Sequence, residues 1–399
     1  LYLIIRFTGP QGLRTSLIES NQKYEVAHWL EELARVIETF KLAGVTSLPM
    51  EKTDKVVSEY LTSRQNHFKT LMLQYVNLVA FKVIIAAGLL LIGGLLVINQ
   101  QMNIGQFVAS EIIIILILSS VEKLILSMET IYDVLAAIEK IGTVADIPLD
   151  PQEGTKLSEN QMTGIAIEIQ EFSYRFKDSS EDIINNINLN INSGEKICLA
   201  GYNGAGKSLL LQLIAGLYDD YRGSISYNGI SHHNCDNADL RSLIGDNLSK
   251  EDIFSGTLKD NITLGRSNIS TQEMIDAISV VGLTDFVRNL KRGFDEMLIP
   301  EGKNLPTSVC VKIKLARSIV GQPKLILIGK SLNELSLKDK KRFLKYVLKK
   351  EWTVVTLTND PVLAELFDKV VIMKKGEIIA NSTIHDHKDK EYYSEIFDR

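Results

Sequence analysis

The chain has 399 residues, which is enough for more than one domain at roughly 100–200 residues per domain. Its 44 Lys and Arg residues against 49 Asp and Glu residues give a formal net charge of −5, so the composition gives no sign of a nucleic-acid partner. The three cysteines lack a CxxC spacing and the histidine clusters His232–Cys235 and His385–His387 lack a second ligand group, so neither a disulfide framework nor a metal site of these residues is predicted.

The first part of the chain is helical by pattern. Residues 1–7 resemble the end of an apolar helix rather than a signal peptide, and the chain begins with Leu1 instead of Met. We therefore expect a fragment whose N-terminal part is missing. Residues 24–70 are polar and periodic, and they are predicted to form long helices that protrude into the cytoplasm.

Two long apolar runs follow, Leu78–Ile98 and Phe107–Met128. Each has the length of about 20 residues that a helix needs to cross a bilayer. The connector, residues 99–105, carries no Lys or Arg, whereas the outer flanks carry several, for example Arg64 and Lys140. This asymmetry predicts a membrane hairpin with both outer ends in the cytoplasm. The alternative is a pair of fully buried helices in a soluble protein.

Charged residues interrupt both apolar runs. Lys82 lies in the first run, and Glu111, Glu122 and Lys123 lie in the second. A carboxylate within a membrane helix faces another helix or a cavity rather than lipid. We expect Glu111 and Glu122 to make helix–helix contacts, with a place in a substrate cavity as the alternative.

The pattern changes after the second run. We predict a helical membrane part over residues 1–148, a polar linker over residues 149–161, and a domain over residues 162–399 in which strands and helices alternate. The expected fold is thus an all-α part followed by an α/β domain with a mixed sheet. The predicted elements of that domain include strands at Ile165–Tyr174, Gly194–Gly201, residues 223–229 and Leu325–Ile328, and a helix over residues 207–218.

The stretch "GYNGAGKS", Gly201–Ser208, fits the phosphate-loop pattern G-x-x-x-x-G-K-[ST] and lies between a predicted buried strand and a predicted helix. The glycines let consecutive backbone N–H groups point at phosphate oxygens, and the helix N-terminus adds its dipole. In this pattern Lys207 reaches the outer phosphates and Ser208 offers a hydroxyl to Mg²⁺. The predicted nucleotide-binding residues of this loop are Gly201, Asn203, Gly204, Ala205, Gly206, Lys207, Ser208 and Leu209.

The phosphate loop and the apolar runs ahead of it resemble the C-terminal part of an ABC exporter half-transporter, and the resemblance covers nearly the whole chain. It implies a type I exporter fold for the helices and a P-loop NTPase fold, the ATP-binding cassette, for the α/β domain. It also implies ATP as cofactor and a second half-transporter as partner, in a homodimer or a heterodimer. The expected place is the plasma membrane, the inner membrane of a bacterium, with lipid around the hairpin and the cassette in the cytoplasm. The transported substrate stays unknown.

Further motifs carry the same resemblance. The stretch "EELARVIETFKLAG", residues 31–44, resembles the second cytoplasmic loop of these exporters, and "FSYRF", residues 172–176, resembles the loop whose aromatic residue stacks on adenine. That residue would be Tyr174. Residues 252–262, Leu315–Ile328 and Thr353–Asp360 are similar to the segments around the glutamine loop, before the Walker B acids and before the switch histidine.

The departures from the family fall on its catalytic positions. General-base catalysis contributes about 10²–10⁴-fold, so loss of the Walker B glutamate implies impaired hydrolysis. The resemblance therefore implies ATP binding, weakened Mg²⁺ binding at Ser208, and no catalytic residue. The substituted positions are Gly329 and Lys330 for the Walker B Asp and Glu, Ser249 for the glutamine, Leu305–Val309 ("LPTSV") for the signature, Ser336 for the D-loop aspartate and Asn359 for the switch histidine.

These observations favour two functions over a self-sufficient ATPase or a decaying gene product. The first is an exporter subunit that couples ATP binding, and a partner's hydrolysis, to transport. The alternative is a non-hydrolytic ATP-binding subunit that regulates or scaffolds a membrane export complex. At the substituted site, we hypothesise that Lys330 pairs with the γ-phosphate and reduces the need for Mg²⁺, and the alternative is that Lys330 is simply exposed.

Overall fold

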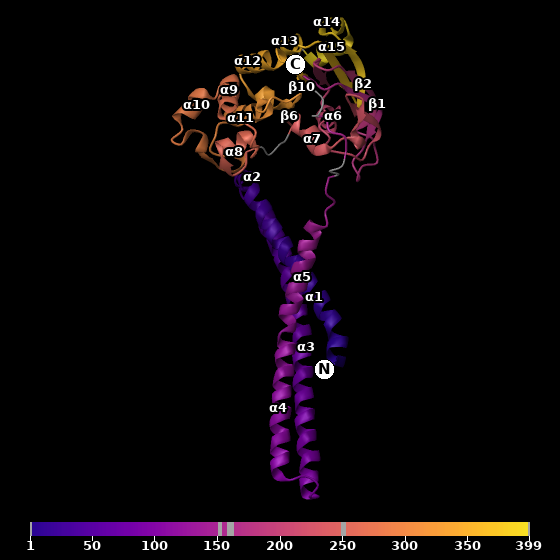
Figure 1. Ribbon diagram of the computed structural model, residues 1–399, viewed down its shortest axis with the longest axis vertical. Helices are drawn as coiled ribbons and strands as arrows, with labels where there is room; N and C mark the ends of the chain where they lie inside the picture. Colours follow the sequence, from indigo (N-terminus) through magenta and orange to yellow (C-terminus); the bar gives the residue numbers. More distant parts are fainter. Residues whose placement is uncertain (1, 151–153, 158–162, 249–252, 398–399) are drawn as a thin grey trace. The chain divides into compact units, whose positions relative to one another are not determined.

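The computed structural model describes residues 2–150, 154–157, 163–248 and 253–397. It divides into two compact units, Leu1–Leu149 and Asp150–Arg399. The described part of the first unit consists of helices, and Figure 1 shows them in indigo to magenta. They are α1 (Tyr2–Arg35), α2 (Ile37–Leu42), α3 (Leu48–Ile98), α4 (Ile104–Leu126) and α5 (Met128–Ala145).

Helices α3 and α4 form a long hairpin and lie side by side (Figure 1). Helix α3, and the stretch Ile104–Ala145 that contains α4 and α5, have the length and apolar composition needed to cross a membrane. Their apolar side chains are mostly exposed, for example Ile84 at 69% and Leu116 at 62%. A core helix of a soluble protein would bury such side chains, so the exposure favours the membrane hairpin over the soluble alternative.

An ion pair joins the two arms of this hairpin. The Lys82 ammonium on α3 donates a hydrogen bond to the Glu122 carboxylate on α4. The two charges that interrupt the separate apolar runs therefore neutralise one another, which lowers the cost of placing either charge among apolar groups. The predicted helix–helix contact is confirmed for Glu122, and for Glu111 it stays a prediction.

The second unit is built on a mixed sheet flanked by an antiparallel one. In the larger sheet, β12 is antiparallel to its neighbour and the other strands are parallel. Its strand order is β12 (Glu377–Ser382), β11 (Lys369–Lys374), β3 (Lys196–Gly201), β10 (Thr353–Leu357), β9 (Leu325–Ile328) and β6 (Ile244–Asn247). The antiparallel sheet has the order β2 (Ile184–Ile191), β1 (Ile167–Tyr174), β4 (Arg222–Tyr227) and β5 (Ile230–Ser231), and β7 (Gly256–Thr257) pairs with β8 (Met297–Leu298).

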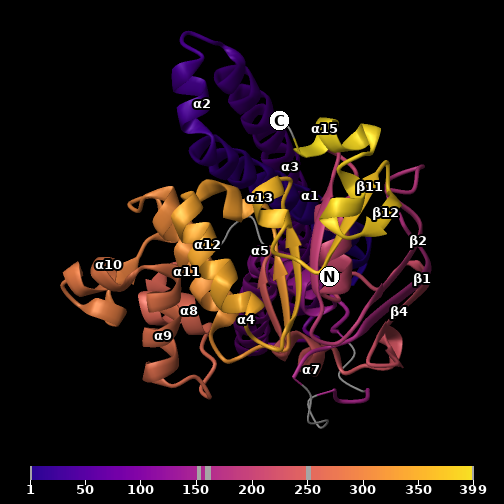
Figure 2. The same ribbon diagram turned by 90° about the horizontal axis from the view of Figure 1, so that it is seen from above.

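Two hydrophobic cores cover the two faces of the larger sheet. Along β3, Ile197 and Leu199 belong to the core shared with the antiparallel sheet, whereas Cys198 and Ala200 belong to the core under helices α8 to α12. Figure 2 shows these helices on one side of the sheet and strands β1, β2 and β4 on the other. A central parallel strand is buried on both faces, which is why β3, β9 and β10 are continuous buried runs.

Helices and short 3₁₀ turns connect these strands. The predicted helix over residues 207–218 ends earlier, at Ile214, because Gly216 adopts a positive φ of 65° just beyond it. The helices are α6 (Lys207–Ile214), α7 (Asn237–Ser242), α8 (Leu258–Thr263), α9 (Thr271–Val281), α10 (Thr284–Asn289), α11 (Thr307–Ile319), α12 (Leu337–Leu348), α13 (Pro361–Ala364), α14 (Ile384–His387) and α15 (Glu391–Phe397). The turns are η1 (His232–Asn234), η2 (Gly293–Asp295), η3 (Pro300–Gly302) and η4 (Lys330–Glu334).

Candidate nucleotide-binding site

The phosphate loop has the strand–loop–helix context that its motif requires. Strand β3 ends at Gly201 and helix α6 begins at Lys207. Between them, Gly204 and Gly206 adopt positive φ values of 77° and 87°, a backbone conformation that a residue with a Cβ adopts only with strain. Gly206 is also the N-cap of α6, and it has no side chain that could accept a hydrogen bond from the first N–H groups of the helix. The first N–H groups of α6 are therefore available to an anion.

The predicted loop residues divide by exposure. Asn203, Gly204 and Ser208 are exposed. Ala205 and Leu209 are buried at 2% and 8% exposure and belong to the core shared with the antiparallel sheet. Their side chains therefore anchor the loop, and only their backbone groups are suited to contact a nucleotide.

Lys207 is folded back over the loop. Its Nζ atom donates hydrogen bonds to the carbonyl oxygens of Gly201 at 2.7 Å and Tyr202 at 2.6 Å, and the residue is 7% exposed. Burial and, to a smaller extent, the positive charge of Lys330 together lower the pKa of Lys207 to about 8. A phosphate group bound in this loop would offset both effects, because it supplies a negative charge beside the ammonium.

Asn359, at the position of the switch histidine, is tied to the phosphate loop. Its Oδ1 accepts a hydrogen bond from the Gly201 N–H at 3.2 Å, and its Nδ2 donates to the Gly201 carbonyl at 3.1 Å. Strands β10 and β3 are adjacent and parallel, so their carboxyl ends meet and bring these two residues together. Asn359 therefore holds the start of the loop through both the oxygen and the nitrogen of its side-chain amide.

The end of strand β9 lacks any acid. Gly329 is buried, and a Cβ atom built on it would lie 2.9 Å from the backbone oxygen of Asn247, closer than real Cβ atoms approach. The exposed Lys330 follows and begins η4. The next residue, Ser331, donates a hydrogen bond from its hydroxyl to Asn247 Oδ1. The segment after β9 thus packs closely against the end of β6, at the position where the family that the chain resembles has its metal-binding aspartate.

These residues are a poor match to a magnesium site. Mg²⁺ prefers oxygen ligands and is usually held in such sites by one or two carboxylates besides the phosphates. Among the described residues expected near the metal, the polar side chains are the Ser208 hydroxyl of the loop and, at two substituted positions, the hydrogen-bonded amide of Asn359 and the Lys330 ammonium. Ser249, at the position of the glutamine, lies outside the described residues. The described donor set suits an anion better than a cation.

Tyr174, the predicted adenine-stacking residue, lies in a cluster of aromatic rings. It is only 6% exposed, and its ring centroid lies 5.4 Å from that of Phe176 and 5.3 Å from that of Tyr218. Phe176 is 42% exposed. In this conformation the ring surface open to a base belongs mainly to Phe176, and stacking on Tyr174 stays a prediction.

The segment in place of the signature forms the start of helix α11. Pro306 is the N-cap, and Thr307 and Ser308 are exposed in the first turn. Their hydroxyls accompany the free N–H groups of a 13-residue helix, an arrangement that attracts anions. Ser336, at the D-loop position, has a structural role, because its Oγ accepts a hydrogen bond from the Asp339 N–H at 3.2 Å and caps α12.

Two features of the site escaped the sequence analysis. The contact of Asn247 with Ser331 joins residues far apart in the chain, and no local pattern announces it. The exposed ring of Phe176 lies within the quoted "FSYRF" motif, so the last aromatic residue of that motif was a usable signal. Both features surround the predicted residues rather than replace them.

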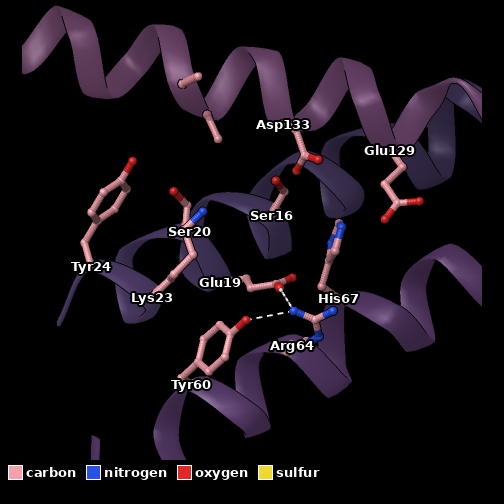
Figure 3. A pocket seen from close by; sticks show the side chains of 12 residues that line it. Ser16, Glu19, Ser20, Lys23, Tyr24, Tyr60, Arg64, His67, Glu129 and Asp133 are labelled. Carbon is pink, nitrogen blue, oxygen red and sulfur yellow. Dashed lines mark hydrogen bonds and ion pairs between the residues drawn. The ribbon is translucent and has the colours of Figure 1, made fainter. Parts of the chain in front are cut away.

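A second polar cavity, of about 390 Å³, lies between α1, α3 and α5 in the helical unit (Figure 3). Arg64 donates a hydrogen bond to the Tyr60 hydroxyl at 2.8 Å and lies 3.8 Å from Glu19. His67, buried at 6% exposure, also lines the cavity, and its Nδ1 atom lies at hydrogen-bond distance, 2.8 Å, from the Thr15 hydroxyl. Acidic and basic side chains thus line this cavity together. The phosphate-loop residues Gly201–Ser208 are not among its lining residues.

Comparison with known proteins agrees with this geometry. Residues 184–329 match the family model described as ABC transporter. The chain is 26% identical over 362 residues to the leukotoxin translocation ATP-binding protein LktB of Mannheimia glucosida, covering 90% of this chain and 51% of that protein. It is 26% identical over 365 residues to the alpha-hemolysin translocation ATP-binding protein HlyB of Escherichia coli O157:H7, covering 90% and 51%. The chain thus spans about half the length of these curated relatives.

A solved structure shows the same fold. The structure of a bacterial Atm1-family ABC exporter with ATP bound superposes with a TM-score of 0.86 at 17% sequence identity, covering 99% of this chain and 70% of that chain. At this identity the likeness establishes the fold of the helices and of the α/β unit. The chain therefore carries an ABC transporter ATP-binding domain behind helices of the exporter fold, and it is homologous to the ABC exporter half-transporters.

Proposed function

We propose that this chain is an ATP-binding subunit of an ABC-type membrane exporter whose own site binds ATP without hydrolysing it. The observation that carries the proposal is the contrast between the ends of two strands, β3 and β9, that flank β10 in the sheet. Strand β3 leads into a complete phosphate loop, whereas strand β9 ends in Gly329 and Lys330 with no acid. Binding uses the first strand end, and general-base catalysis would need the second.

Transport in this proposal requires a second half-transporter. ATP-binding cassettes of this family work as pairs, in which the signature of one chain faces the phosphate loop of the other. Thr307 and Ser308 at the exposed start of α11 supply hydroxyl and N–H donors to the partner's nucleotide. A heterodimer in which the partner brings its own Walker B acids would then hydrolyse ATP at that second site. The length and apolar composition of the hairpin α3–α4 support a membrane location, and the proposal takes this membrane to be the plasma membrane, with the cassette in the cytoplasm.

The second candidate is a regulatory or scaffold subunit that binds ATP in an export complex and supports no hydrolysis. It is favoured by the presence of both defects in one chain, since the strand β9 acids and the signature are substituted together. Mixing the chain with an intact half-transporter that it binds separates the two candidates. ATP turnover that depends on Thr307 and Ser308 supports the exporter subunit.

The main test is ATP binding and ATP turnover by the full chain in lipid, beside the variant Lys207→Ala. We expect wild-type chain to bind ATP, the variant to lose binding, and neither to turn over ATP. Turnover by the wild type that vanishes in Lys207→Ala would contradict the proposal, because it would show that a base exists elsewhere in the site. Absence of ATP binding by the wild type would also contradict the proposal, because the proposal requires a phosphate loop that binds ATP.

A further inference from the structure

The ends of four parallel strands meet at the phosphate loop. Strand β10 pairs with β3 and β9, and β9 pairs with β6, all in parallel, so the segments after these strands emerge at one edge of the sheet. They bring Gly201, Asn359, Gly329 and Asn247 to this edge. These segments of the chain therefore lie closest to the place of the terminal phosphate of a nucleotide bound in the loop.

The structure has closed the position from which an acid would hold Mg²⁺. A Cβ on Gly329 would meet the Asn247 backbone oxygen at 2.9 Å, so strand β6 would have to move to admit any side chain there. Asn247 also has a side-chain Nδ2 atom that is buried and lacks a hydrogen-bond partner among the described residues. A buried N–H donor without a partner in the described part of the chain therefore lies on the residue that packs against Gly329, the position of the family's aspartate.

Two lysines lie at this edge. Lys207 folds over the loop after β3, and the exposed Lys330 directly follows the end of β9, which is separated from β3 by strand β10 alone. A divalent cation placed beside these ammonium groups would be repelled about twice as strongly as a monovalent one. ATP without its metal carries more negative charge than the magnesium complex, and it gains more from two neighbouring lysines.

We propose that this site binds ATP without needing a metal ion, with the Lys330 ammonium contacting the terminal phosphate in place of that ion. The inference rests on the proposed function, because it assumes that the phosphate loop binds ATP. Lys330 is a binding residue in this scheme. Its exposed side chain starts directly after buried Gly329, so the ammonium reaches the phosphate from the strand end that would otherwise carry the acids.

The experiment measures the affinity of the full chain in lipid for radiolabelled ATP by equilibrium dialysis, once with excess Mg²⁺ and once with EDTA. We expect the two wild-type affinities to agree within about threefold, and Lys330→Ala to lose about tenfold or more in EDTA, the usual worth of a charge-assisted hydrogen bond. Lys330→Arg keeps the cation and should retain the affinity in EDTA. Lys345→Ala, an exposed lysine on α12, controls for the loss of one positive charge.

The outcomes separate the inference from the proposed function. ATP binding by the wild type only in Mg²⁺, or an EDTA affinity that Lys330→Ala leaves unchanged, overturns the inference and leaves the ATP-binding subunit standing. A fall as large in Lys345→Ala as in Lys330→Ala also overturns it, because the effect would then follow net charge alone. Absence of ATP binding under both conditions overturns the proposed function itself.

Discussion

Replacing Asn359 by alanine should loosen the phosphate loop even without nucleotide. The Asn359 amide accepts from the Gly201 N–H at 3.2 Å and donates to its carbonyl at 3.1 Å. Gly201 is buried, so its N–H group would lose this acceptor in a place that water reaches poorly. A buried donor left without a partner costs about 1–3 kcal/mol. We therefore expect Asn359→Ala to lower the free energy of unfolding by about 2 kcal/mol.

The loss is measurable as a shift in thermal unfolding. For a domain the size of the α/β unit, about 2 kcal/mol corresponds to a drop of roughly 4–8 °C in the unfolding midpoint. Circular dichroism of the full chain in detergent follows this transition. Asn359→Asp keeps the acceptor for the Gly201 N–H and loses the donor to its carbonyl, so its midpoint should fall less than that of Asn359→Ala.

The matched control is Asn333→Ala, which removes the same amide from an exposed residue of η4. Its midpoint should stay near that of the wild type, since surface substitutions change stability by about 0.5 kcal/mol or less. Equal midpoints for Asn359→Ala and the wild type would refute the reasoning. They would mean that the loop keeps its conformation without the asparagine.

The remaining predictions concern the hairpin, one histidine and one helix cap. Lys82→Met leaves Glu122 without its ion-pair partner and should lower stability in detergent by about 2 kcal/mol, whereas the exchange Lys82→Glu with Glu122→Lys should restore most of it. Burial lowers the pKa of His232 below its ordinary value of about 6.5, so the unfolded chain binds this proton at higher pH than the folded chain does. The free energy of unfolding should therefore fall as pH drops below about 6.5, and it should fall less steeply in His232→Gln. Ser336→Ala should cost about 1 kcal/mol, because it removes the N-cap acceptor of the Asp339 N–H, and Ser336→Asp should keep the stability.

Each of these has an outcome that would contradict it. An exchange of Lys82 and Glu122 that is no more stable than Lys82→Met would show that the pair does not form. Parallel stability curves for the wild type and His232→Gln between pH 7 and pH 5 would show that the folded chain protonates His232 as easily as the unfolded one. A stability of Ser336→Ala equal to that of the wild type would remove its capping role.

The sequence was sufficient where structure follows from neighbours in the chain. The phosphate loop needs glycines at fixed offsets before a Lys and a Ser, and the structure confirms the strand before it and the helix after it. The two apolar runs are equally local, because the length of a run and its flanking charges are read directly along the chain. The buried strand Leu325–Ile328 was likewise predicted to the residue.

The absence of the catalytic acids was also visible in the sequence, but the contacts made by the residues that replace them were not. Gly329 could be read as a missing aspartate, and only the fold shows that the backbone of Asn247 has closed over the position. Asn359 could be read as a missing histidine, and only the pairing of β10 with β3 shows that it holds Gly201. Sequence position says which side chain is present, whereas strand pairing decides what it touches.

The same division holds in the helical unit. Lys82 and Glu122 each look like a defect in an apolar run when the runs are read separately. The hairpin brings them together across two helices, where they form an ion pair. Local composition determines which segments become helices and strands, because hydrogen bonding and burial within a segment depend on nearby residues. Contacts between distant residues depend on how the segments pack, and the tertiary structure decided them.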